Sequence, residues 1–179
     1  MKKNLFTLAN QITIFRIVLI PVIVILLIQH VTTWAAGLLA FSVLTDLLDG
    51  LAARLRKERT AIGAFLDPLA DKLLLTSVYL TLAYLGLIDM WLFVIVFSRD
   101  LLIVLGWGVI YILTSSSNIT PRWLGKGTTA VQMAAALAFI TPVPPEIQSF
   151  LIWGIVLMTV ASVVDYIIVA EKRLGQWSL

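Results

Sequence analysis

The chain is a succession of six long apolar segments separated by short polar or turn-forming stretches. The segments are Ile12–Gln29, Trp34–Ala53, Ile62–Tyr84, Trp91–Leu113, Thr128–Ile140 and Ile147–Ala170. A helix needs about 20 apolar residues to cross a bilayer, and most of the segments reach that length. The fifth is short unless it begins near Leu124. Only helices satisfy their own backbone in lipid, and no strand-like alternation is present. We therefore predict an all-α membrane protein with six transmembrane helices in a single domain, residues 1–179.

Composition supports lipid as the solvent. Hydrophobic residues make up 60% of the 179 and charged residues 13%, against about 45–50% and about 25% in soluble domains. The core of a 179-residue protein cannot bury this excess of hydrophobic side chains. The chain has no Cys and one His, His30, which excludes thiolate metal sites and argues against a histidine-based site or a Ser-His-Asp triad. Any bound metal should be a hard cation held by oxygen.

Basic residues fall on one side of the predicted topology. With a cytoplasmic N-terminus, the residues on that side are Lys2, Lys3, Arg54, Arg56, Lys57, Arg59, Arg122, Lys126, Lys172 and Arg173. The three opposite loops contain His30, Asp89 and Glu146 but no Lys or Arg. This asymmetry predicts that both termini are cytoplasmic, and it argues against nucleic acid as the partner. We expect the first apolar segment to be retained as a membrane helix, because no small-residue cleavage site follows it.

Four aspartates lie in or beside the second and third segments, where carboxylates are costly and usually functional. Asp46 and Asp49 are three residues apart, and Asp67 and Asp71 are four apart, so each pair shares one helix face. A connection of about eight residues makes the two helices antiparallel neighbours. Four carboxylates brought together repel one another in a low dielectric. Protonation or two divalent cations would relieve this repulsion, and oxygen ligands suit magnesium, manganese or calcium.

Two other interpretations of the aspartates remain open. They could form a salt-bridge cluster with nearby basic residues, which are Arg54, Arg56, Lys57, Arg59 and Lys72. They could also line a cation-transport pathway. Against transport, the acids cluster at one end of the predicted bundle and no internal repeat is visible.

The aspartates belong to a longer motif. The run from Asp46 to Arg54, Asp-Leu-Leu-Asp-Gly-Leu-Ala-Ala-Arg, is followed after eight residues by Gly63-Ala-Phe-Leu-Asp67-Pro-Leu-Ala-Asp71. This pattern resembles the complete motif of the CDP-alcohol phosphotransferases, a family with six membrane helices and cytoplasmic termini. The resemblance implies transfer of a phosphatidyl group from CDP-diacylglycerol to a second alcohol, with release of CMP.

The resemblance also implies roles for individual residues. Asp46, Asp49, Asp67 and Asp71 would bind two divalent ions, Mg²⁺ or Mn²⁺, and Asp71 would also take the proton from the attacking hydroxyl. The residues implied to bind the CDP-alcohol are Asn10, Thr13, Gly50, Arg54 and Thr60. Asn10 and Thr13 belong to a stretch, Asn10-Gln-Ile-Thr13-Ile-Phe-Arg16, that resembles the family's N-terminal segment but has Ala9 in place of Pro and Ile12 in place of Leu. A helix N-cap is the alternative for Asn10 and Thr13.

The acceptor alcohol depends on weaker features. The stretches Gly63–Lys72 and Leu124–Met133 are similar to bacterial phosphatidylglycerophosphate synthases, which use glycerol 3-phosphate. We predict that Arg99, Arg122 and Lys126 bind the acceptor phosphate. A membrane anchor is the alternative for Arg122, and a buried pair with Asp100 or Asp165 is the alternative for Arg99.

Ser98-Arg99-Asp100 instead looks like the cardiolipin synthases of the same family, which use phosphatidylglycerol. Glycerol 3-phosphate is the favoured acceptor, and inositol phosphate, serine or choline is less favoured. The resemblance further implies a homodimer in a bacterial inner membrane, among membrane lipids, with its active site facing the cytoplasm.

Overall fold

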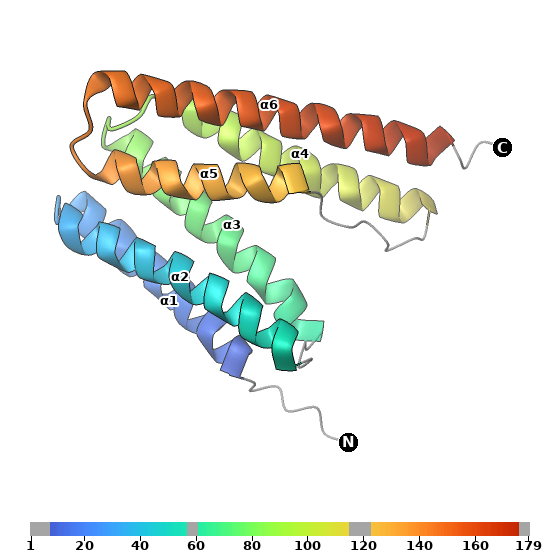
Figure 1. The fold of residues 1–179 in the computed structure, drawn as a ribbon, viewed down its shortest axis with the longest axis horizontal. Helices are drawn as coiled ribbons and strands as arrows, with labels where there is room; N and C mark the ends of the chain where they lie inside the picture. The colour runs from blue at the N-terminus through green and yellow to red at the C-terminus, as the bar shows by residue number, and fades with distance from the viewer. Residues whose placement is uncertain (1–7, 57–60, 115–122, 176–179) are drawn as a thin grey trace. The chain divides into compact units, whose positions relative to one another are not determined.

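The computed structural model describes residues 8–56, 61–114 and 123–175 (Figure 1). The helices are α1 (Leu8–Ile28), α2 (Thr32–Arg56), α3 (Ala61–Tyr84), α4 (Met90–Thr114), α5 (Trp123–Ile140) and α6 (Pro145–Gly175). Every regular element in these ranges is an α-helix, which confirms the all-α prediction. The six helices match the six apolar segments, and the largest differences are an earlier start of α1 and α5 and a later end of α6.

Two helices end in the same backbone motif. After α3, the N–H of Gly86 bonds to the carbonyl of Ala83 and the N–H of Leu87 to that of Leu82. Gly86 has a positive φ of 70°, as this C-terminal cap requires. After α1, His30 takes the equivalent place with a φ of 58°, and its N–H bonds to the carbonyl of Leu27. The single histidine is therefore an exposed turn residue.

Proline sets the start of α6. Thr141 Oγ1 donates a hydrogen bond to the carbonyl of Ala138 at 2.9 Å as α5 ends. Pro145 then occupies the first helical position, where its missing N–H costs nothing and its fixed φ suits the helix.

By length and composition, two segments of the described chain are able to cross a membrane, Gln11–Ile28 and Pro145–Glu171. Buried core helices of soluble proteins share this length and composition. Large apolar side chains are nevertheless exposed along the helices, among them Phe150 at 77% and Leu157 at 68% of α6. Six membrane crossings and the orientation of the termini stay predictions.

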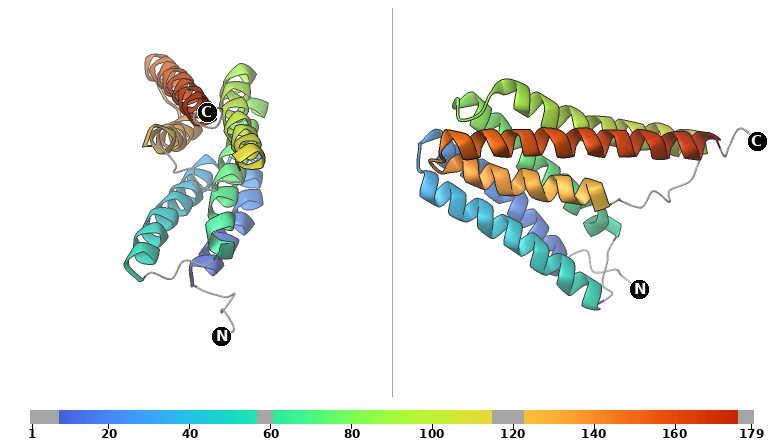
Figure 2. Two further views of the ribbon diagram at one scale, coloured as in Figure 1. Left: turned by 90° about the vertical axis from the view of Figure 1, so that its right-hand side faces the viewer. Right: turned by 45° about the horizontal axis from the view of Figure 1, so that its top comes forward.

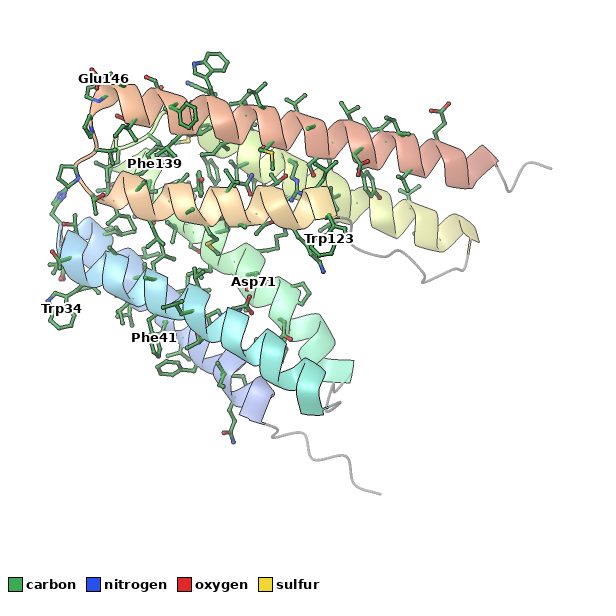
Figure 3. The ribbon with its side chains drawn as sticks, in the orientation of Figure 1. Trp34, Phe41, Asp71, Trp123, Phe139 and Glu146 are labelled. Atoms are coloured by element: carbon green, nitrogen blue, oxygen red, sulfur yellow. The ribbon has the colours of Figure 1, made fainter. Side chains whose placement is uncertain are left out.

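Two tryptophans stand at helix starts. Trp34 in the first turn of α2 and Trp123 at the first residue of α5 project from the helices (Figure 3), with exposures of 69% and 90%. Tryptophan prefers the headgroup region of a bilayer, so both positions fit predicted membrane boundaries.

The helices form two compact units. The first contains α1, α2 and α3 together with residues 136–142, and the second contains residues 89–135 and 143–179. In the first unit, α1 packs against both α2 and α3 (Figures 1 and 2). Its core is aliphatic, with Ile23 and Leu27 of α1, Leu39 of α2 and Leu74 and Val78 of α3 almost completely buried.

In the second unit, α4 packs against α6, and α5 is bonded to α6 by polar side chains. Thr128 Oγ1 donates to the carbonyl of Met158 at 3.2 Å, and Gln132 Nε2 donates to Thr159 Oγ1 at 3.2 Å. Such interhelical hydrogen bonds contribute about 1 kcal/mol each in membrane proteins.

Close packing of α4 on α6 depends on a glycine. A Cβ atom at Gly106 would lie 2.7 Å from Cε1 and 2.8 Å from Oη of Tyr166, whereas a Cβ at Gly108 would meet nothing within 4 Å. We predict that Gly106→Ala lowers the unfolding temperature in detergent, with a cost of about 1–3 kcal/mol for overpacking. Gly108→Ala is the matched control, because both changes bring the same gain in helix propensity. Equal unfolding temperatures for the two variants would contradict the prediction.

Candidate active site

A polar face of α1 meets the aspartates of the neighbouring helices. Thr13 and Arg16 are three residues apart and each is 2% exposed. Thr13 Oγ1 donates a hydrogen bond to Asp67 Oδ1 of α3 at 2.6 Å. Arg16 Nη2 pairs with Asp46 Oδ1 of α2 at 2.7 Å, and Arg16 Nη1 donates to Asp71 Oδ1 of α3. One face of α1 thus holds carboxylates from both neighbouring helices.

The burial of these groups is unequal. The Arg16 side chain is 2% exposed, whereas that of Asp46 is 40% exposed and that of Asp71 is 33% exposed. Asp71 lies on α3 as labelled in Figure 3. The guanidinium is therefore on the buried side of the cluster, and the carboxylates reach from it toward the open side.

The sequence prediction that acids of α2 and α3 lie together is supported by the shared contact of Asp46 and Asp71 with Arg16. Asp49 follows Asp46 by three residues in α2, and its place on the same face stays a prediction from helical spacing. The side chains of Asn10, Asp49, Gly50 and Arg54 lie outside the described part of the structure, as does all of Thr60.

The N-cap alternative for the N-terminal motif is wrong. Helix α1 begins at Leu8, so Asn10 and Thr13 both lie inside it. An N-cap side chain bonds to backbone N–H groups of its own helix, but the Thr13 hydroxyl reaches Asp67 on α3. Thr13 and Arg16 of this segment therefore face the acidic cluster.

The residues predicted to bind an acceptor phosphate come from the second unit. Arg99 of α4 is 3% exposed. Its Nη1 donates to Asp100 Oδ1 at 2.7 Å, which confirms the buried pair with Asp100 that the sequence left open. Ser162 Oγ accepts from its Nε at 3.2 Å and from its Nη2 at 2.7 Å. Nη2 also donates to the carbonyl of Gly125 at 3.3 Å.

Lys126 follows Gly125 in the first turn of α5 and is exposed. Arg122 lies outside the described residues. Binding of a phosphate by these three residues stays a prediction.

Known proteins resemble this chain over most of its length. The family model of the CDP-alcohol phosphatidyltransferases matches residues 6–163. The chain belongs to the CDP-alcohol phosphatidyltransferase family. A probable phosphatidylglycerophosphate synthase of Mycobacterium tuberculosis is 32% identical over 186 residues, which cover 97% of this chain and 86% of that protein.

Other relatives are cardiolipin synthases. A probable cardiolipin synthase (CMP-forming) of Drosophila melanogaster is 37% identical over 150 residues, which cover 74% of this chain and 46% of that protein. The human cardiolipin synthase (CMP-forming) is 35% identical over 153 residues, 84% of this chain and 50% of the relative. The chain thus spans about half the length of these animal relatives.

The donor chemistry of the site suits the divalent metals on which this family generally depends. The aspartates of the cluster offer carboxylate oxygens, and these are the ligands that Mg²⁺ and Mn²⁺ prefer. Among the described side chains, no group of three or more acidic or histidine residues is arranged to hold a metal ion, and Asp49 is not among them. Metal binding by the four aspartates therefore stays a prediction.

Sequence reasoning gave no role to Arg16, although it is the residue that joins Asp46 to Asp71. Two signals point to it. A basic residue stands within the apolar run of α1, where a charge is expensive, and it closes the segment that resembles the family's N-terminal motif. In this CDP-alcohol phosphatidyltransferase, α1 is thus part of the candidate site.

The contacts of Arg99 predict a measurable dependence on Ser162. Ser162→Ala would leave two buried N–H groups of Arg99 short of a partner, and an unmet buried donor costs about 1–3 kcal/mol. We expect a lower unfolding temperature in detergent. Ser42→Ala is the matched control, because Ser42 is also buried but its hydroxyl bonds to no described residue. Equal effects of the two substitutions would show that Ser162 does not stabilise Arg99.

Proposed function

We propose that this chain transfers the phosphatidyl group of CDP-diacylglycerol to glycerol 3-phosphate, giving phosphatidylglycerophosphate and CMP. Family membership supports phosphatidyl transfer from a CDP-alcohol. At this site, the proposal is supported by the contact of α1 with the aspartates of the motif. Thr13 donates a hydrogen bond to Asp67, and Arg16 pairs with Asp46 and Asp71. Phosphoryl transfer depends mainly on positioning and charge neutralisation, and this cluster serves both.

The reaction is a substitution at the phosphorus atom that carries the diacylglycerol. A hydroxyl oxygen of the acceptor forms the new P–O bond, the bond to the CMP oxygen breaks, and CMP leaves with the electron pair. Asp71 takes the hydroxyl proton. Its contact with Arg16 uses Oδ1, and a carboxylate keeps further acceptor capacity on its second oxygen.

All four aspartates, Asp46, Asp49, Asp67 and also Asp71, would hold two divalent ions. Bound Mg²⁺ or Mn²⁺ would neutralise the diphosphate and stabilise the attacking and leaving oxygens.

The nucleotide side of the donor is bound by other motif positions. Arg54 supplies planar N–H donors suited to phosphate oxygens. Gly50 allows close approach of the nucleotide, because it has no side chain in the way. Asn10, Thr13 and Thr60 complete the donor site. Thr13 does so while its hydroxyl fixes Asp67.

Glycerol 3-phosphate is the proposed acceptor because the relative covered over nearly its full length is a probable phosphatidylglycerophosphate synthase. Lys126, exposed in the first turn of α5, provides a cation that a water-soluble phosphate can reach, with Arg122 close in sequence and Arg99 in α4. The second candidate acceptor is phosphatidylglycerol. Two observations favour it, the Arg99–Asp100 sequence and the higher identity to cardiolipin synthases.

The setting follows from the same proposal. In this proposal the side rich in basic residues is cytoplasmic, and the termini and the acidic cluster lie at the cytoplasmic face of a bacterial inner membrane. There, a membrane-bound CDP-lipid and a soluble acceptor meet. The protein works as a homodimer of six-helix chains.

The central test uses purified protein with CDP-diacylglycerol and measures CMP release. We expect release with Mg²⁺ or Mn²⁺ present and loss of release with EDTA. Asp71→Asn should lower the rate by about 100-fold or more, the usual contribution of general base catalysis. Asp89→Asn, a change in an exposed loop, is the control and should leave the rate intact.

The same assay identifies the acceptor. Glycerol 3-phosphate, phosphatidylglycerol and inositol phosphate are offered in parallel, and the product lipids are resolved by mass. Phosphatidylglycerophosphate is the expected product. Cardiolipin would establish the second candidate, and metal-independent release or full activity of Asp71→Asn would contradict the proposed chemistry.

Lys126 provides a test of acceptor binding. We predict that Lys126→Ala raises the KM for glycerol 3-phosphate about tenfold or more while the KM for CDP-diacylglycerol changes little, because a phosphate loses a charged partner. Lys126→Arg should restore most of the affinity. An equal rise in both KM values would argue against a role in acceptor binding.

A further inference from the structure

Arg16 occupies an unusual place for a charged side chain. It is 2% exposed and lies within the apolar segment of α1. A buried charge is costly unless it is paired, and Arg16 pairs with two carboxylates, Asp46 on α2 and Asp71 on α3. Its buried Nε makes no hydrogen bond with any described residue. The two terminal nitrogens therefore carry its described polar contacts, one to each neighbouring helix.

The geometry of guanidinium gives this contact a specific effect. The group is planar, rigid and always protonated in proteins. Because Nη1 and Nη2 bond to different carboxylates, the fixed fork sets how the two carboxylates stand relative to each other. An ammonium group is a single point charge and cannot impose that relation.

The side from which Arg16 contacts the two carboxylates matters as well. Arg16 touches Oδ1 of each carboxylate from the buried side, while the carboxylates themselves are 40% and 33% exposed. A carboxylate has about four lone-pair positions, so each retains acceptor capacity. A cation arriving from the exposed side can use that capacity without breaking the contacts with Arg16.

We propose that Arg16 is a positioning residue that pre-orients Asp46 and Asp71 for a divalent cation by holding one oxygen of each carboxylate from the buried side of the bundle. This inference rests on the proposed function, in which both aspartates bind metal. Thr13 does the same for Asp67 through its hydroxyl. The polar face of α1 is thus a template for the metal-binding carboxylates of α2 and α3.

The test measures binding of Mn²⁺ alone to the full chain in detergent by electron paramagnetic resonance, without substrate. Arg16→Lys keeps the charge but loses the fork, and Arg16→Met removes both. We expect Mn²⁺ affinity to fall at least tenfold in each variant. Ser42→Ala, a buried change one turn before Asp46 on α2, is the control and should bind Mn²⁺ as the wild-type chain does. The unfolding temperature without metal verifies that each variant is folded, and Arg16→Lys is the milder variant if Arg16→Met fails to fold.

The outcomes separate three roles for Arg16. Unchanged Mn²⁺ affinity in folded Arg16→Lys would overturn the proposal and leave a purely structural role. Tighter binding in Arg16→Met would also overturn it, because Arg16 would then act as a charge that competes with the metal. In the expected case, the Mn²⁺ concentration for half-maximal CMP release rises by the same factor as the dissociation constant.

Measurements on the wild-type chain keep this inference distinct from the proposed function. A wild-type chain that binds Mn²⁺ and releases CMP, alongside an Arg16→Lys variant of unchanged affinity, would overturn the role of Arg16 alone. A wild-type chain that neither binds Mn²⁺ nor releases CMP would overturn the proposed function itself.

Discussion

The first unit depends on the pairing of Arg16 with the carboxylates of two helices. A guanidinium that is 2% exposed among aliphatic residues is tolerated because Asp46 and Asp71 compensate its charge. The reverse also holds, since two acids that share one cation repel each other less than they would alone. The contact therefore links α1 to α2 and α3 and also sets the positions of two carboxylates of the family motif.

The second unit also contains a buried arginine, but its charge is compensated in a different way. Arg99 is as deeply buried as Arg16, but among its described partners only its sequence neighbour Asp100 is charged. Its other partners, Ser162 Oγ and the carbonyl of Gly125, are neutral. Arg99 thus links α4 to α6 and to the first turn of α5 as a hydrogen-bonding hub. Arg16 instead links two acidic side chains of the predicted metal site, Asp46 and Asp71.

The sequence predicted the helices well because their ends are chemically marked. The last apolar turns give way to Gly86 or to the prolines before α6, and the boundaries follow. The predicted start of α1 was too late. The residues just before Ile12 are less apolar than the predicted membrane segment, but they are still helical.

For the site, helical spacing showed which aspartates share a face, but not which residue of another helix they meet. Spacing within α2 and α3 contains no information on the rotation of α1. For this reason Arg16 was missed, and the Thr13 hydroxyl could be assigned to its own helix rather than to Asp67.

Arg99 and Lys126 differ in burial and in bonding, and this difference bears on which of them binds the acceptor phosphate. An acceptor phosphate must reach its cation from water, and it must compete with the partners that the cation already has. Arg99 is 3% exposed and already bonded to Asp100, Ser162 and Gly125, so a phosphate contact would have to replace one of these. Lys126 is exposed and adjacent in sequence to Gly125, whose carbonyl Arg99 holds. The proposed division of labour is therefore that Lys126 contacts the acceptor phosphate while Arg99 mainly fixes the first turn of α5 that presents it.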